Sequence, residues 1–391
     1  MHRRGRLRAL ITDAWVPPHH PLHAVPGSFL QPLAERHNAA LLDAPVHANT
    51  TGLLVHEALA RLQQSTGWDR IMRRNQWFEE HAVSVIRDHR LLETDPAPVV
   101  FAYSYAAHDL FVEAKKHGAT CVLGQIDAGP HEENIVAAEH ARHPAYNSRQ
   151  IRAPQAYWDR WRAECDLADV IIVNSRWSKQ ALAEAGIKGD HVRVVPLAYT
   201  AKATGMPVRT VPDAFTEERP LRILYLGTLT LRKGVARMIE AAHQVDHLPI
   251  ELRVVGGGAL NLPERAKEAR NIRWMGRVPR SETIRHYRSA DVFLFPTLSD
   301  GFGLTQLEAQ STGLPIIASK RCGDVVTSGV NGIELDPLTP EAIAEALSQC
   351  VNDPNEVRRM SENSPHRMER FAPKQVVDRL QAEIQQATSI P

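Results

Sequence analysis

Short apolar runs rich in β-branched residues alternate along this chain with stretches whose apolar residues recur at helical spacing. Such alternation is typical of α/β folds, in which helices connect parallel strands. The runs expected to form strands in the first half are 7–14, 99–105, 119–127, 169–175 and 191–197. The stretches expected to form helices there are 28–37, 108–118, 131–142 and 178–186.

A second α/β series follows residues 199–220, a stretch without periodicity that contains three prolines and that we interpret as a linker. The strands expected after it are 222–227, 251–257, 271–276, 291–297 and 315–319. The helices expected there are 234–245, 281–290, 304–313, 340–351 and 374–387. The pattern therefore predicts two Rossmann-like domains, roughly 1–198 and 199–371.

Two consecutive helices, 51–64 and 68–89, are less typical of a doubly wound fold. The second carries, close together, Arg70, Arg73, Arg74 and Trp77. We favour a solvated basic face with one buried aromatic residue. An acceptor-binding or membrane-surface patch is the alternative interpretation.

Net charge, cysteine spacing and the lengths of the apolar segments narrow the function classes and the cellular compartment expected for this protein. A formal net charge of +1 gives the chain no overall field that would attract nucleic acid or a membrane surface. The four cysteines lie far apart without metal-ligand or redox spacing, which favours a reduced, cytoplasmic protein. The basic and then apolar start of the chain is interrupted at Asp13 and has no cleavage site, so we expect a core strand there. No stretch approaches the roughly 18 apolar residues that span a bilayer.

Ligands of open α/β sheets bind beyond the carboxyl ends of the strands. In the second half these ends are rich in glycine, which lets a ligand approach the backbone, and they are expected at Gly227, 256–258, 275–277 and 298–303. Arg232 and Lys233 precede a glycine and a new helix, an arrangement that suits a diphosphate. A pair of solvated surface charges is the alternative for these two cations.

The segment 295–319 carries the strongest signal. Asp300 is expected on the turn after a strand, and Glu308 lies one turn into a helix that starts near Leu304. The two carboxylates can bracket a nucleotide sugar by accepting hydroxyl hydrogen bonds, while N–H groups of the turn hold phosphate. A capping Asp and a Glu favoured by the helix dipole explain each acid alone. They do not explain Phe302, which we expect to be exposed between two glycines.

Two further patterns are weaker. The stretch from Gly256 onwards fails the dinucleotide fingerprint G-x-G-x-x-G because Asn261 stands at its last glycine. His19, His20 and His23 occupy a proline-rich loop without a nearby acid or cysteine, so we interpret them as loop residues and expect no metal site.

Residues 223–335 resemble the retaining GT-B glycosyltransferases of family 4, the glycosyl transferases group 1. The resemblance rests on YLGTLTLRKG, VVGGG, NIRWMGRVPRSETIRHYRSADVFLFPT, DGFGLTQLEAQSTGLPIIAS and VVTSGVNGIEL, in this order and spacing. Residues 164–199 look like the end of that family's acceptor domain. The resemblance implies two Rossmann-like domains facing across a cleft, with the terminal segment 372–391 packing back on the first.

The resemblance also implies roles. Lys233 corresponds to the phosphate-binding lysine, Glu308 to the acid that bonds the donor ribose, and Asp300 to the acid near the hydroxyls of the transferred sugar. Arg277 and Val278 match the place where the nucleobase is held. The residues implied to line the sugar and diphosphate are Gly301, Phe302, Gly303, Leu304 and Thr305, and the other donor-side residues are Gly227, Thr228 and Gly256.

Two departures from the family concern the donor side. Asp300 stands where the family has glutamate, so its side chain is one methylene shorter. Thr228 replaces the usual arginine after the strand glycine, so one phosphate-binding charge is missing unless Arg232 supplies it.

Two further departures concern the acceptor side. The family often has a histidine where this chain has Gln125, Ile126 and Asp127, and the glycine-rich acceptor loop is only partly present around Gly27. The acceptor-side residues expected here are therefore Gly27, Gln125 and Asp127.

The resemblance implies an enzyme that moves a sugar from a nucleoside-diphosphate sugar, UDP- or GDP-linked, to an acceptor hydroxyl with retention of configuration. The acceptor is expected to be a glycan, a lipid-linked saccharide or a small molecule, with no metal or other cofactor and no nucleic acid partner. The protein is expected in the cytoplasm or peripherally at the inner face of the membrane, in contact through its N-terminal domain. The alternatives are a sugar-nucleotide epimerase and a non-catalytic nucleotide-sugar-binding homologue.

Overall fold

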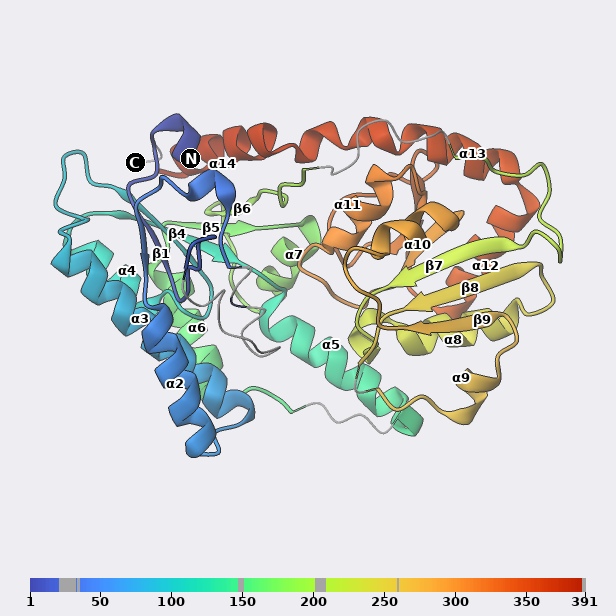
Figure 1. Cartoon of the computed structure of the whole chain (residues 1–391), viewed down its shortest axis with the longest axis horizontal. Coiled ribbons are helices and arrows are strands. Elements are labelled where there is room, and N and C mark those ends of the chain that lie inside the picture. The colour runs from blue at the N-terminus through green and yellow to red at the C-terminus, as the bar shows by residue number, and fades with distance from the viewer. Residues whose placement is uncertain (21–32, 34–35, 147–150, 201–208, 259, 389–391) are drawn as a thin grey trace. The chain divides into compact units, whose positions relative to one another are not determined.

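The computed structural model describes residues 1–20, 33, 36–146, 151–200, 209–258 and 260–388 (Figure 1). Contacts group the chain into two compact units. The N-terminal unit comprises Met1–Gln125, Ala153–Ile171 and Ile384–Pro391, and the C-terminal unit comprises Ile126–Arg152 and Ile172–Glu383. The domain boundaries expected from the sequence, 1–198 with 372–391 and 199–371, stay a prediction.

The first half contains two parallel sheets. The elements up to the third strand are η1 (His2–Arg4), β1 (Leu10–Thr12), η3 (Ala39–Leu41), β2 (Val46–Ala48), α2 (Thr50–Leu62), α3 (Gly67–Asp88) and β3 (Val99–Tyr103). Those that follow are α4 (His108–Lys116), β4 (Thr120–Gln125), α5 (Gly129–Arg142), η4 (Pro144–Tyr146), α6 (Gln155–Leu167), β5 (Val170–Val173), α7 (Arg176–Glu184) and β6 (Val192–Val194). β1 pairs with β2, and the other four strands have the order β3-β4-β5-β6.

The strands and helices expected in this half are confirmed, except for the helix at 28–37, most of which lies outside the described residues. Strand β2 was not predicted, and neither was helix α6. Its buried residues Trp161 and Cys165 are four positions apart, and Pro154 stands at its N-cap, so a helical signal was present.

The second half forms a six-stranded sheet. The elements up to its third strand are β7 (Leu221–Leu226), η5 (Leu231–Lys233), α8 (Val235–Gln244), β8 (Ile250–Val255), α9 (Glu264–Glu268) and β9 (Ile272–Gly276). The next are α10 (Thr283–Ser289), β10 (Val292–Phe295), α11 (Leu304–Ser311), β11 (Ile316–Ser319) and β12 (Gly332–Leu335). The chain ends with α12 (Pro340–Asn352), α13 (Pro354–Asn363), η6 (Pro365–Arg367), η7 (Glu369–Phe371) and α14 (Pro373–Thr388).

All pairings in this sheet are parallel, and the strand order is β12-β11-β10-β7-β8-β9. This is the strand order of a doubly wound Rossmann fold. The strands and helices expected here are confirmed, while α9, α13 and β12 were not predicted.

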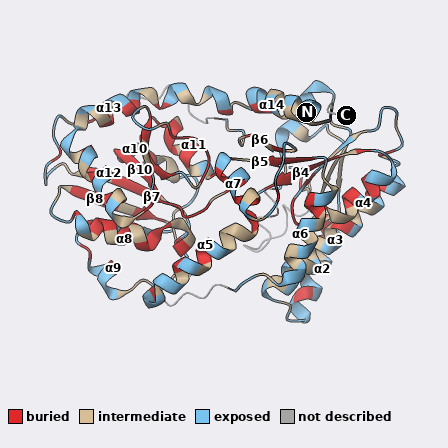
Figure 2. Ribbon diagram, turned by 180° about the vertical axis from the view of Figure 1, so that it is seen from behind, coloured by how far each residue is buried: buried red, intermediate tan, exposed pale blue. Residues whose placement is uncertain are grey.

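Alternation along the strands divides the core of this unit into two layers. Ile223 and Leu294 pack in one cluster with buried residues of α8 and α12. Leu224 and Phe293 pack in the other cluster with buried residues of α10 and α11. Figures 1 and 2 show these helix pairs on opposite faces of the sheet, as a strand period of two residues requires. Among the described helices, none is long and apolar enough to cross a membrane.

Candidate donor site at the switch point

The strand order reverses between β7 and β10. From β7 the chain continues to β8 on one side, and from β10 it continues to β11 on the other, so the two connections leave in opposite directions. A crevice therefore forms beyond the carboxyl ends of these two strands, which is where doubly wound folds bind ligands. The segments that follow them are 227–234 and 296–303, and they contain most of the expected donor-side residues.

Lys233 and Asp300 lie opposite one another across this switch point, and their side chains form an ion pair. The two side chains are 17% and 16% exposed, so the pair is partly desolvated but still reached by solvent. The backbones also meet here, because Gly234 has a φ of 74° and a Cβ atom at this residue would collide with the carbonyl oxygen of Pro296. Only glycine satisfies both conditions, which brings the two expected ligand-binding residues together.

Arg232 lies beside this pair. Its Nη1 donates to the carbonyl oxygen of Ser299 at 2.9 Å and lies 3.7 Å from Oε1 of Glu132. Burial raises the pKa of the Glu132 carboxyl, while the charge of Arg232 lowers it. Glu132 belongs to α5, which lies against η5, and no local motif in the sequence marked it. The structure therefore adds a partly buried acid to the charges expected here.

Helix α11 begins at Leu304, as expected, and Gly303 at its N-cap has a φ of 82°. Glu308 is half-buried, and its Oε2 accepts a hydrogen bond from the hydroxyl of Tyr287 at 2.9 Å. Burial and the neighbouring carboxylate raise the pKa of Tyr287, so it stays a hydrogen-bond donor. Tyr287 orients Glu308, and sequence reasoning missed it because the two residues are 21 positions apart.

The expected exposure of Phe302 is wrong. Its side chain is 2% exposed and belongs to the core layer formed with α10 and α11. It packs edge-on against Phe371 with 5.9 Å between the ring centroids. Phe302 therefore holds the turn to the core, since burying an aromatic ring is strongly favourable. Because it is buried, its side chain does not line a ligand surface.

The glycines expected at the strand ends do lie together. The N–H of Gly227 donates to the carbonyl of Val255, and the N–H of Gly256 donates to that of Gly276, at 3.0 and 2.8 Å. The exposed Arg277 side chain covers the next turn, because a Cβ at Gly257 would lie 2.6 Å from its Nε.

The remaining donor-side residues lie on these segments. Thr228 is exposed, and its carbonyl accepts from the hydroxyl of Tyr225 at 2.9 Å. Val278 packs against the core layer of α10 and α11, and Thr305 is half-buried in the first turn of α11. Gly301 lies so close to the carbonyl oxygen of Ile126 that a Cβ atom there would collide with it.

The three expected acceptor-side residues differ in burial and in whether the structure describes them. The side chain of Gln125 is buried and is bonded to two aromatic residues of the N-terminal unit. Asp127 is half-buried, and its Oδ1 accepts from the N–H of Gly129 at 2.9 Å at the start of α5. Gly27 lies outside the described residues.

The basic face of α3 is neutralised by acids. Arg70 pairs with Glu57, and Arg74 lies 2.6 Å from Asp13 and 3.7 Å from Glu57. Arg73 pairs with Asp69 at 2.9 Å. These pairs agree with a solvated face, but the acids leave it little net positive charge, and Trp77 is half-buried rather than buried.

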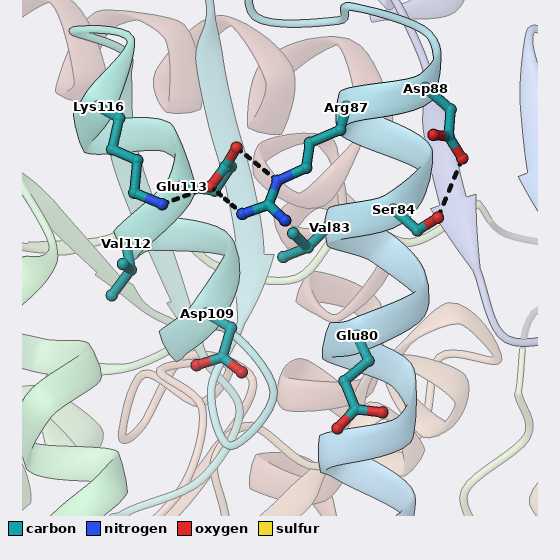
Figure 3. A pocket seen from close by; sticks show the side chains of 9 residues that line it. All are labelled: Glu80, Val83, Ser84, Arg87, Asp88, Asp109, Val112, Glu113 and Lys116. Atoms are coloured by element: carbon teal, nitrogen blue, oxygen red, sulfur yellow. Dashed lines mark hydrogen bonds and ion pairs between the residues drawn. The ribbon is translucent and has the colours of Figure 1, made fainter.

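A groove of about 530 Å³ lies between α3 and α4 (Figure 3). Arg87 donates to both carboxylate oxygens of Glu113 at 2.8 and 2.7 Å, and Lys116 donates to the same carboxylate at 2.8 Å. These bonds lower the pKa of Glu113 to about 2. Both cations that line the groove therefore bond Glu113, and Ser84 donates to Asp88 at 3.0 Å, so the groove has the character of a surface ion network.

Within the described residues, one group has the spacing of a metal site, namely Glu79, His108 and Asp109. The guanidinium of Arg160 pairs with Glu79 and lies 3.0 Å from Asp109. A cation is therefore already present among these ligand atoms, and the arrangement fits an ion-pair cluster better than a metal centre.

Comparison with solved structures identifies the fold. The chain aligns with Anabaena Alr3699/HepE in complex with UDP and glucose at a TM-score of 0.58, over 98% of this chain and 100% of that one, with 16% identity. It aligns with the lipopolysaccharide outer core galactosyltransferase WaaB at 0.57, over 97% and 99%, also with 16% identity. The fold is that of the GT-B glycosyltransferases, and the α/β, GT-B class expected from the sequence is confirmed.

Residues 211–367 match the family described as glycosyl transferases group 1, so the expected resemblance to group 1 is confirmed for this part of the chain, while family 4 and retention stay predictions. A D-inositol 3-phosphate glycosyltransferase from Corynebacterium urealyticum is 30% identical over 233 residues, 53% of this chain and 54% of that protein. The O-antigen chain mannosyltransferase B of Escherichia coli is 31% identical over 142 residues, 33% of this chain and 36% of that protein. The chain spans about half the length of the first of these relatives.

Proposed function

We propose that this protein transfers a sugar from a nucleoside-diphosphate sugar, UDP- or GDP-linked, to an acceptor hydroxyl with retention of anomeric configuration. The observation that carries the proposal is the pair of Lys233 and Asp300 across the switch point, beside Arg232 and the N-terminus of α11. One structural neighbour, Anabaena Alr3699/HepE, is in complex with UDP and glucose, which favours a uridine donor. Group 1 membership of residues 211–367 supports the reaction class.

Donor binding divides the ion pair between two parts of the ligand. Lys233 turns to the diphosphate, and Asp300 accepts a hydrogen bond from a hydroxyl of the transferred sugar. The carboxylate thus holds the lysine in place until the phosphates arrive. Because the two side chains are mutually neutralised, neither charge is left uncompensated in a partly buried position.

The reaction breaks the bond between the sugar's anomeric carbon and the diphosphate, and it forms a bond from that carbon to the acceptor oxygen. The departing diphosphate gains negative charge and takes the acceptor's proton on a phosphate oxygen. Lys233, Arg232 and the free N–H groups at the start of α11 stabilise that growing charge. We therefore propose that the reaction needs no divalent metal.

Glu308 binds the donor ribose in this proposal, with Tyr287 fixing the orientation of its carboxylate. The acceptor is a glycan, a lipid-linked saccharide or a small molecule. The place of action is the cytoplasm, with or without contact with the inner membrane face.

The decisive experiment combines binding and turnover. A thermal-shift screen with UDP-, GDP-, ADP- and dTDP-sugars identifies the donor, because a ligand raises apparent stability by mass action. The protein is then incubated with that donor alone. Slow release of free sugar and nucleoside diphosphate supports a transferase, whereas conversion to an isomeric nucleotide sugar would show an epimerase. Binding without any turnover, also with a panel of acceptors, would show a non-catalytic binder.

A further inference from the structure

A second pocket lies in the N-terminal unit and has a volume of about 290 Å³. This is near the lower end of the roughly 300–1,000 Å³ typical of small-molecule sites, so it suits one ring. The residues that give it its chemistry are Asn75, Gln76, Tyr105, Tyr157, Arg160 and Trp161. They come from α3, from the segment after β3 and from α6, all within one compact unit.

Tyr105 is held in a conformation that residues other than glycine rarely adopt, with a φ of 77°. Its N–H donates to Oε2 of Glu164 at 2.7 Å, and the N–H of Ala107 donates to Oε1 of the same carboxylate at 2.9 Å. Glu164 is fully buried. A buried acid thus fixes a strained backbone in one position, and such strain is typical of ligand-binding segments.

Gln125 joins two aromatic walls of this pocket. Its Nε2 donates to the hydroxyl of Tyr105 at 3.1 Å, and its Oε1 accepts from Nε1 of Trp161 at 2.9 Å. Tyr157 stacks on Tyr105 with 4.9 Å between ring centroids and 17° between ring planes. The aromatic walls are therefore fixed before any ligand binds, which lowers the entropic cost of binding.

The charge of the pocket favours a neutral ligand. Arg160 pairs with Glu79, which is buried, and lies 3.0 Å from Asp109, so its charge is compensated. A guanidinium carries five N–H donors, and those not used by the two acids can donate to hydroxyl groups. Asn75 adds an amide that both donates and accepts.

We propose that this pocket binds one uncharged saccharide ring of the acceptor. The apolar face of the ring lies against the aromatic walls, and its hydroxyls bond to Asn75, Gln76 and Arg160. This inference rests on the proposed function, since it names the acceptor as a molecule with a neutral sugar. An aromatic platform beside amide and guanidinium donors suits a polyhydroxylated ring, which has both apolar and hydrogen-bonding surfaces.

The test uses the full chain and the methyl α-glycosides of glucose, mannose and galactose, with glucose 6-phosphate as the anionic probe. Saturation-transfer NMR and the fluorescence of the tryptophans report binding. We expect millimolar binding of at least one methyl glycoside and weaker binding of the phosphate. Tyr157→Ala and Asn75→Ala should each weaken glycoside binding, the former roughly three- to tenfold, as loss of an aromatic contact does. Tyr103→Ala, which removes an exposed aromatic residue outside the pocket, should change nothing.

The affinity for UDP, measured by calorimetry on the same variants, separates this inference from the proposed function. Unchanged UDP binding with weakened glycoside binding supports a saccharide site in this pocket. If Tyr157→Ala does not fold, Asn75→Ala provides the same test. A wild-type protein that binds no glycoside, or that prefers the phosphate, overturns the inference even if UDP binds. Glycoside binding without any binding of UDP or of GDP would keep the pocket as a saccharide site and reject the proposed transferase.

Discussion

At the scale of single residues, the charged groups at the switch point of the candidate donor site are each paired with a group of opposite charge or with a carbonyl. Lys233 and Asp300 form an ion pair, and Arg232 lies between the carbonyl of Ser299 and the carboxyl of Glu132. Each cation thus has a protein partner that a diphosphate can replace. Asp300→Asn should therefore do more than remove a sugar contact, because it also frees Lys233 for phosphate.

Lys233→Ala should lower kcat on the order of a hundred- to thousandfold, as loss of a comparable electrostatic donor does. The contact strengthens as the diphosphate leaves, so the loss falls on turnover more than on donor KM. Steady-state kinetics with the screened donor measure it, and Lys267→Ala, an exposed lysine paired with Glu264, serves as the control. A double Arg232→Ala, Lys233→Ala variant with turnover within about threefold of wild type would refute the role.

Glu308→Ala should raise donor KM roughly ten- to hundredfold with little change in kcat, since a charged hydrogen bond contributes about 1.5–3 kcal/mol. Tyr287→Phe should raise KM by a smaller factor, because Glu308 keeps its charge but loses the bond that orients it. Tyr146→Phe, at a buried tyrosine elsewhere in the same unit, is the matched control. A donor KM that stays at the wild-type value in Glu308→Ala would remove the ribose assignment.

Burial raises the pKa of Glu164 from 4.5 to about 7, while its bonds from the N–H groups of Ala107 and Tyr105 lower it. The folded state therefore favours the protonated acid. Its contribution to stability is fully present below the unfolded pKa of 4.5 and is lost as pH rises through about 7. We expect the free energy of unfolding to fall by up to about 3 kcal/mol over this window.

Glu164→Gln keeps the shape of the side chain but cannot ionise. As pH rises from 4.5 to about 7, the melting temperature of the wild type should therefore fall relative to that of the variant. The measurement is a thermal melt of both proteins across the window. If the melting temperatures of the two proteins changed in parallel with pH, the raised pKa of Glu164 would be contradicted.

At the scale of elements, the turn after β10 is packed against the segment that leads from β4 into α5. Gly301→Ala would place a Cβ against the carbonyl oxygen of Ile126, so one of the two segments must shift. Overpacking of this kind costs typically about 1–3 kcal/mol. Gly227→Ala, whose Cβ would make an ordinary contact at 3.7 Å, should leave the melting temperature nearly unchanged. Equal melting temperatures for the two variants would mean that the turn yields without cost.

Elements of the second sheet were predictable because their signals are local. β10 and β11 are short and fully buried, and a continuous apolar run bounded by turn residues marks them. The positions of Lys233, Asp300 and Glu308 beyond the strand ends were predictable too, while their roles in binding and turnover stay a prediction. The burial of Phe302 was not predictable, because it depends on Phe371, which is 69 positions further along the chain. Tyr105 was missed for the same reason, since its positive φ depends on the distant Glu164.

At the scale of the whole molecule, residues 126–152 belong with the C-terminal sheet although they precede it by many residues. Glu139 of α5 is buried and bonds Arg237 of α8 at 2.8 and 2.6 Å. The Arg237 side chain is 12% exposed, so the pair is well desolvated. The sequence could not predict this association, which depends on a contact across 98 positions.

Glu139→Ala should lower the free energy of unfolding by about 3–5 kcal/mol, because it leaves a largely buried guanidinium without its carboxylate partner. Lys320→Ala, which breaks the exposed pair with Asp336, should cost at most about 1 kcal/mol. Chemical denaturation measures both. The double variant Glu139→Ala, Arg237→Met should recover part of the loss, and a Glu139→Ala protein as stable as the lysine control would show that α5 is not held by this pair.

The attachment of α5 has a practical consequence for recombining this protein with its relatives. A chimera joined in the linker after residue 198 would take α5 from one parent and its partners on α8 and on the turn at Gly301 from the other. Such a chimera would not exchange acceptor preference alone. Ile126 and Glu139 of one parent would also have to pack against residues of the other parent. Crossovers that transfer residues 126–152 together with the C-terminal sheet keep each contact within one parental sequence.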